Sequence, residues 1–96
     1  MPQIIYTDEF INDFERLYIF LEEKNPPAAQ KLAALLEEKL DLLSSIPKAF
    51  AFLGEFRLYL LQFGSSGYAI LYDYNEELDT ITILRIKHQK EAGFNH

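Results

Sequence analysis

The sequence contains no cysteine among its 96 residues. A disulfide framework and a thiolate nucleophile are therefore both excluded, which fits a reducing compartment. No apolar run approaches the ~20 residues that a membrane-spanning helix needs. The N-terminus also lacks the basic region followed by an apolar stretch that marks a signal peptide. We therefore expect a cytoplasmic protein that does not associate with a membrane.

Nucleotide-binding and acyl-transfer motifs are missing as well. The chain has neither the Gly-x-Gly-x-x-Gly pattern nor the phosphate-binding Walker pattern. Ser65 and Ser66 lack the Gly-x-Ser-x-Gly elbow and have no histidine close to them in sequence. No histidine or third carboxylate lies at ligand spacing from the acidic pairs Glu22-Glu23, Glu37-Glu38 and Glu76-Glu77. We therefore expect no metal site and no cofactor.

Positive charge is scarce in this chain. The net charge of −6 argues against indiscriminate nucleic-acid binding, because such binding depends mainly on phosphate contacts. Acids predominate in residues 1–56, whereas residues 57–96 are nearly neutral. The cations of the second half fall at predicted strand ends and in the tail; they are Arg57, Arg85, Lys87 and Lys90. This distribution is compatible with a local positive patch on an acidic protein.

The first half of the chain carries two helical patterns, in a sequence whose length indicates one domain over residues 1–96. Residues 3–6 form a short β-prone run, which we interpret as an edge strand. Thr7 is placed to cap a helix that ends near Lys24, because Asn25 precedes a proline and is pushed out of the helical region. Asn25 then caps a second helix, and the short link predicts an antiparallel hairpin. The expected buried stripes are Phe10, Phe14, Leu17, Tyr18 and Leu21, then Ala29, Leu32, Ala33, Leu36, Leu40 and Leu43.

The second half carries three runs rich in aromatic and β-branched residues, at 56–63, 68–74 and 79–86. Turn-forming segments at 64–67 and 75–77 separate them. Connections this short force antiparallel pairing, because a parallel crossover needs a dozen or more residues. We therefore predict a β-meander.

The predicted fold class is α+β with two layers, in the order β-α-α-β-β-β. The N-terminal strand and the helical hairpin are expected to pack on one face of the meander. The connector at 48–54 carries Phe50, Phe52 and Leu53, which we expect to lie under the helices. In the last strand, alternation predicts that Ile81 and Ile83 share a face with Arg85 and Lys87.

Six side chains form the plausible reactive set: Arg57, Tyr72, Arg85, Lys87, His88 and Lys90. Each also has a structural interpretation. Arg57 is suited to pair with a carboxylate such as Glu55 or Asp73. Tyr72 is suited to be a half-buried strand residue, and Arg85 to protect the end of a strand. His88 titrates nearest neutral pH, but a lone histidine at a strand end is often structural.

Several short motifs, in their order and spacing, resemble the RelE/ParE superfamily of bacterial toxins. The resemblance covers nearly the whole chain. The motifs are Phe56-Arg57 at the start of a strand, Gly67-Tyr68 opening the next, Leu71-Tyr72 within it, His88-Gln89-Lys90-Glu91-Ala92-Gly93-Phe94 after the last strand, and upstream Asn25-Pro26-Pro27-Ala28-Ala29.

This resemblance implies the same strand-helix-helix-sheet order and one of two activities. RelE-like members cut messenger RNA in the ribosome without a metal, using basic residues and a tyrosine or histidine. ParE-like members poison DNA gyrase and are not known as nucleases. Members of both kinds are held inactive by a small antitoxin encoded alongside.

If the chain is a ribonuclease, the resemblance assigns it a catalytic set by position. That set is Arg57, Tyr72, Arg85 and His88. The loop at 46–55 offers only Lys48, whereas vigorous RNA cutters are often rich in lysine or arginine there. Ribosome-dependent toxins are also typically basic, and this chain is acidic.

We therefore expect a ParE-like inhibitor of DNA gyrase, neutralised by a small cognate antitoxin. The expected target-binding residues are Lys87, His88, Lys90 and Phe94. The alternatives are a RelE-like nuclease acting on messenger RNA in the ribosome, and an inactive stand-alone relative. Either a homo-oligomer or a toxin–antitoxin hetero-oligomer is compatible with the sequence.

Overall fold

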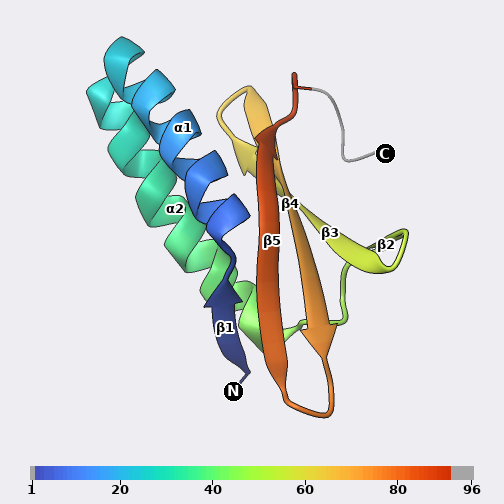
Figure 1. The fold of residues 1–96 in the computed structure, drawn as a ribbon. Helices are drawn as coiled ribbons and strands as arrows, with labels where there is room; N and C mark the ends of the chain where they lie inside the picture. The colour runs from blue at the N-terminus through green and yellow to red at the C-terminus, as the bar shows by residue number, and fades with distance from the viewer. Residues whose placement is uncertain (1, 92–96) are drawn as a thin grey trace.

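The computed structural model describes residues 2–91 and forms two layers, a helical hairpin and a five-stranded sheet (Figure 1). The sheet order is β1-β5-β4-β3-β2. β1 pairs with β5 in parallel, and the other neighbours are antiparallel. The elements are β1 (Gln3–Tyr6), α1 (Asp8–Lys24), α2 (Pro26–Ser45), β2 (Phe52–Leu53), β3 (Phe56–Phe63), β4 (Ser66–Asn75) and β5 (Thr80–His88).

The helical hairpin depends on two capping residues. The Thr7 hydroxyl accepts the backbone N–H of Phe10 at 3.1 Å and so begins α1. Asn25 serves both helices: its backbone N–H donates to the Leu21 carbonyl at 2.7 Å, and its side chain accepts the Ala28 N–H at 3.2 Å. One residue therefore ends α1 and begins α2, as predicted.

Within residues 2–91, no helix is long and apolar enough to cross a membrane.

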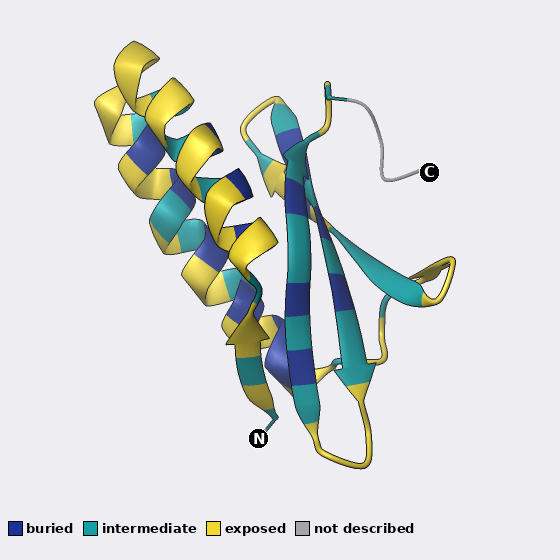
Figure 2. Ribbon diagram, in the orientation of Figure 1, coloured by how far each residue is buried: buried dark blue, intermediate teal, exposed yellow. Residues whose placement is uncertain are grey.

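The core lies between the hairpin and one face of the sheet, where the buried positions of both layers face each other (Figure 2). Its helical part confirms most of the predicted stripes; Phe14 and Leu21 are partly buried against the core, whereas Tyr18 and Ala33 are partly buried outside it. The buried apolar side chains are Phe10, Leu17, Ala29, Leu32, Leu36, Leu40 and Leu43 from the helices, and Leu61, Tyr68, Ile70, Tyr72, Ile81, Ile83 and Ile86 from the sheet. The predicted α+β class and element order are confirmed, with one strand added.

The added strand, β2, corrects the interpretation of the connector. Phe50 does pack against the core and meets the ring of Tyr59 edge-on at 4.8 Å. Phe52 and Leu53 do not lie under the helices; they pair with β3 at the outer edge of the sheet, and Phe52 is 64% exposed. The prediction was wrong because Gly54, at φ 64°, reverses the chain and makes the connector a tight hairpin.

A β-bulge in β5 corrects the predicted faces of the last strand. Tyr72 lies opposite Ile83, but Leu71 lies opposite Arg85, so Leu84 is an extra residue without a partner on β4. The bulge shifts the alternation by one position. Ile83 and Ile86 therefore share the core face, and Arg85 does not share a face with Ile83.

Leu36 tests this packing, with Leu42 on the same helix as its matched control. Leu36 is 6% exposed, whereas Leu42 is 46% exposed. Leu36→Ala should lower the free energy of unfolding by ~2–5 kcal/mol, because it leaves a cavity in the core. Leu42→Ala should change it by less than ~0.5 kcal/mol. Urea unfolding of both variants measures the difference, and equal losses would refute the assignment of Leu36 to the core.

Candidate functional site

Arg57 holds the loop that joins α2 to the sheet. Its Nη1 donates to the carbonyl of Lys48 at 3.1 Å and to the carbonyl of Phe50 at 2.8 Å. The ring of Phe52 stacks on its guanidinium, with 4.0 Å between the ring centroid and Cζ. The expected pairing with Glu55 or Asp73 is not what the structure shows, because the loop carbonyls take those donors instead.

Tyr72 lies directly opposite Arg57 on the neighbouring strand. Its side chain is fully buried, and its hydroxyl donates to the carbonyl of Pro47 at 2.8 Å. Burial raises the pKa of Tyr72, although the positive charge of Arg57 acts in the opposite direction. Arg57 and Tyr72 therefore fix the same loop from two adjacent strands.

Arg85 forms an ion pair with Asp13 of α1. Its Nε donates to Asp13 Oδ2 at 2.7 Å, and its Nη2 donates to Oδ1 at 3.0 Å. The backbone N–H of Ile86 also donates to Asp13 Oδ2, at 3.2 Å. Both carboxylate oxygens are thus occupied, in the two-pronged geometry that strengthens such pairs.

Asp13 was missed in the sequence because helical spacing places it beside the apolar stripe, among side chains expected to be solvated. In the structure it is only 7% exposed. Burial by itself would raise the pKa of Asp13. Hydrogen bonds from Arg85 and from the Ile86 N–H, with the positive charges of Arg85 and Arg16, outweigh burial and lower that pKa. The sequence could have revealed this pair only if the bulge at Leu84, which shifts Arg85 off the face of Ile83, had been predicted.

His88 is held at both ring nitrogens. Its Nδ1 accepts the backbone N–H of Lys90 at 3.1 Å, and its Nε2 lies 2.6 Å from Ser66 Oγ. Because Nδ1 is an acceptor, the proton of the neutral ring is on Nε2, which donates to the serine. Ser66 therefore does not donate to His88, and the pair lacks the arrangement of a serine nucleophile with its base. The pairing of β4 with β5, which places Tyr68 opposite His88, brings Ser66 beside the histidine, and sequence distance did not reveal this.

The predicted catalytic residues lie in separate places. Arg57 and Tyr72 are neighbours, but His88 lies opposite Tyr68, four positions away along β4. At about 3.3 Å per residue, that separation is about 13 Å. Arg85 lies opposite Leu71 and faces Asp13. The structure therefore brings together two members of the set and leaves the other two apart.

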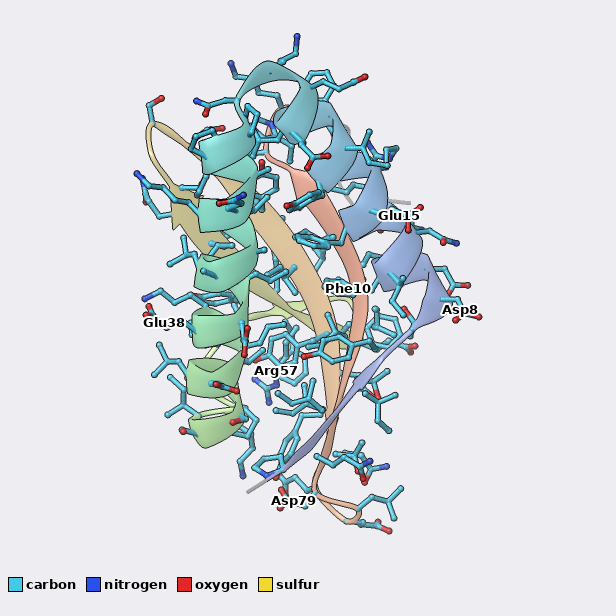
Figure 3. The ribbon with its side chains drawn as sticks, turned by 90° about the vertical axis from the view of Figure 1, so that its left-hand side faces the viewer. Asp8, Phe10, Glu15, Glu38, Arg57 and Asp79 are labelled. Atoms are coloured by element: carbon cyan, nitrogen blue, oxygen red, sulfur yellow. The ribbon has the colours of Figure 1, made fainter. Side chains whose placement is uncertain are left out.

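Of the predicted target-binding residues, Lys87 lies on β5 opposite Ala69, and Lys90 follows the strand at an exposed position. Phe94 lies outside the described residues. Acidic side chains lie around the periphery of the molecule: Asp8 and Glu15 on the outer side of α1, and Glu38 on the outer side of α2 (Figure 3). Among residues 2–91, no three histidine or carboxylate side chains cluster closely enough to hold a metal ion.

The arrangement of two helices on one face of this sheet is the fold of known bacterial toxins. It is similar to the chromosomal ParDE toxin–antitoxin system from P. aeruginosa, with a TM-score of 0.71 and 17% identity over 92% of this chain and 96% of that one. It is also similar to the intact E. coli RelBE toxin–antitoxin complex, with a TM-score of 0.63 and 14% identity over 95% of this chain and 100% of that one.

Sequence comparison identifies the family within that class. The chain belongs to the family described as ParE toxin of type II toxin-antitoxin system, parDE, whose model matches residues 4–93. It is also 41% identical over 61 residues to Toxin RelE1 of Caulobacter vibrioides. That match spans 62% of this chain and 66% of the relative, just under two thirds. The RelE/ParE resemblance is confirmed, and the chain belongs to a family of toxins of type II toxin–antitoxin systems.

Asp13 should make the stability of the protein sensitive to acid. Because its folded pKa is lowered, the carboxylate stabilises the fold above its unfolded pKa of about 3.9 and loses this effect as pH falls through the folded pKa. Asp13→Asn should cost about 1.5–3 kcal/mol at neutral pH, the usual worth of hydrogen bonds to a charged group. It should also reduce the loss of stability on acidification.

Urea unfolding at about pH 7 and about pH 3 measures both effects. Glu22→Gln is the matched control, because Glu22 is an exposed acid of the same helix. It should change stability by less than about 0.5 kcal/mol. An Asp13→Asn protein with the wild-type pH dependence would contradict the assignment.

Proposed function

We propose that this chain acts in the cytoplasm as a ParE-like inhibitor of DNA gyrase, and that a small cognate antitoxin neutralises it. The contact with gyrase is a protein-binding surface that includes the end of β5 and the residues after it. Lys87, His88, Lys90 and Phe94 belong to this surface. No proton transfer is required of any of them.

The observation that carries this proposal is the dispersal of the side chains a ribonuclease would need. Arg57 and Tyr72 are used to hold the loop at 47–50. His88 lies about 13 Å away along β4, at about 3.3 Å per residue. A general acid must lie within hydrogen-bond reach of the group that it protonates, so this separation favours a function other than RNA cleavage.

Charge supports the same conclusion. Binding of RNA depends on cations that neutralise phosphates, and this chain carries a net charge of −6. Of its nine basic side chains, four form ion pairs with carboxylates: Arg16, Lys39, Lys48 and Arg85. Contact with a protein target requires no such excess of positive charge.

A metal-independent ribonuclease acting in the ribosome is the second candidate, favoured by the similarity to Toxin RelE1. In that mechanism Arg57 and Arg85 hold the scissile phosphate, and Tyr72 orients the substrate. His88 donates a proton to the departing oxygen. A histidine that donates this proton carries hydrogen on both ring nitrogens. Its Nδ1 can then no longer accept the hydrogen bond from the backbone N–H of Lys90.

His88→Ala separates the two candidates. Loss of a general acid lowers a cleavage rate by about 10²–10⁴-fold. Loss of one interface side chain usually costs less than about 1 kcal/mol, so gyrase inhibition should fall by less than about tenfold. His88→Gln introduces a polar amide but no titratable ring. It should lower cleavage as much as His88→Ala does if the protein is a ribonuclease, and should change gyrase inhibition little if it is not.

Truncation after Ile86 should abolish toxicity, because it removes the proposed gyrase contact. Cells that express the wild-type protein should form filaments and accumulate DNA damage while their messages stay intact. Immediate arrest of translation with cleaved messages, and its loss in His88→Ala, would establish the ribonuclease instead.

The antitoxin has two surfaces available on the described part of the chain. A groove of about 350 Å³ on α1 is lined by Phe10, Ile11, Phe14, Glu15 and Tyr18. The outer edge of β3 is covered by β2 only at Phe56 and Arg57. Leu58 donates its N–H outward to Ala51, so alternation points the backbone groups of Leu60 and Gln62 outward as well.

We infer that the antitoxin docks along the helical hairpin and this outer sheet edge, because a flexible segment can bury both apolar side chains and an unpaired strand edge. The product of the adjacent small gene should copurify with this chain and restore growth. Ile11→Asp should weaken copurification, whereas Asn12→Asp on the neighbouring position should not. Failure of both copurification and rescue would count against an antitoxin partner.

A further inference from the structure

The outer edge of β5 is only half covered by a strand. β1 pairs with β5 from Thr80 to Ile83, whereas β5 continues to His88. Beyond Ile83 the edge is covered by α1 and the residue before it. Thr7 donates its N–H to the Ile83 carbonyl at 3.1 Å and directs its hydroxyl to the Leu84 carbonyl at 2.9 Å.

Asp13 completes this cover about two turns further along α1. Its Oδ2 takes the N–H of Ile86, the group that a longer β1 would otherwise engage. The same carboxylate binds the guanidinium of Arg85 at both oxygens. A charged side chain of the helix therefore substitutes for a strand, at a position where the bulge at Leu84 has already displaced the ladder.

Residues 85–91, which we call the arm, consist of the end of β5, where residues 85–88 pair with β4, and the three residues that follow. The arm is also fixed at its far end. Arg16 lies one turn after Asp13 and pairs with Glu91, at 3.0 Å between Nη1 and Oε1. On the opposite side, Gln89 donates its N–H to the carbonyl of Gly67 at 2.9 Å. A Cβ on Gly67 would lie 2.8 Å from the Leu61 carbonyl oxygen and 3.2 Å from Gln89 Oε1, so the close approach requires glycine.

We propose that Asp13 is a positioning residue for the toxic surface, holding the arm in the orientation that the cellular target recognises, with Arg16 as its auxiliary at the far end. The inference rests on the proposed function, because the arm carries Lys87, His88 and Lys90. Asp13 itself does not touch the target. It acts through Arg85 and the Ile86 amide, and α1 serves as the rigid support.

The experiment compares three purified variants with the wild type by amide hydrogen exchange, in parallel with growth inhibition in cells under titrated expression. Asp13→Asn removes one acceptor oxygen and the negative charge. Asn12→Ala changes the neighbouring exposed residue and leaves the arm contacts in place. Leu36→Ala destabilises the whole fold from the core and leaves the polar contacts of the arm in place.

Asp13→Asn should raise the exchange rates of arm amides, Ile86 above all, by about tenfold more than it raises those of α2 and β3, which respond only to the loss of global stability. The NMR chemical shift of the Ile86 amide proton should also change, because its N–H no longer donates to a carboxylate. Toxicity should fall at least about tenfold, because a mobile arm must be ordered before it binds. Asn12→Ala should match the wild type.

Leu36→Ala identifies a merely structural effect. It should raise exchange throughout the molecule, and at equal amounts of folded protein it should retain toxicity. Unchanged arm exchange in Asp13→Asn would overturn the anchoring, and a released arm with full toxicity would overturn the positioning role. Equal loss of toxicity in Leu36→Ala at matched folded protein would also overturn it.

If Asp13→Asn does not fold, Arg16→Ala takes its place, since its exposed side chain contributes little to stability. It should loosen residues 89–91 alone and lower toxicity in proportion. A supercoiling assay of wild-type protein with gyrase tests the proposed function separately. A negative result there refutes gyrase as the target, while exchange and growth inhibition still decide the role of the arm.

Discussion

The structure depends on how α1 covers the part of β5 that extends beyond its shorter neighbour β1. β1 is four residues long and β5 is nine. An uncovered strand edge leaves backbone groups that invite pairing with other chains. Thr7 and Asp13 take these groups one after another. The same contacts fix the rotation of α1, so the stripe of Phe10 and Leu17 faces the sheet and the core can form.

A second theme is that the polar side chains best suited to chemistry are used to hold backbone segments. Arg57 and Tyr72 bind carbonyls of one loop, and His88 ties Ser66 to the segment that follows β5. Hydrogen bonds of this kind rigidify their surroundings, most strongly at buried Tyr72, where breaking the bond would leave a partner unsatisfied. A surface ordered in advance loses less conformational entropy when it binds a partner.

Local signals predicted most of the fold. Asn25 before Pro26 identified the helix boundary, and the short turns identified the meander, because both effects depend only on neighbouring residues. Two features escaped prediction because they depend on distant ones. The bulge at Leu84 lies in the pairing of β5 with β4, and buried Asp13 contacts Arg85, which is 72 positions away in the sequence. The sequence therefore indicated candidate residues, and their arrangement came only from the structure.

The pairing of β1 with β5 also affects how the chain acquires its structure during synthesis. Gln3 pairs with Thr80, so β1 can join the sheet only after β5 has been made. Contacts between such distant segments form late, because the intervening chain must close into a loop first. The helical hairpin, by contrast, joins through the single residue Asn25 and needs only local contacts. The hairpin can therefore form before β5 has been made, whereas β1 can take its place in the sheet only after residues 80–83 are available.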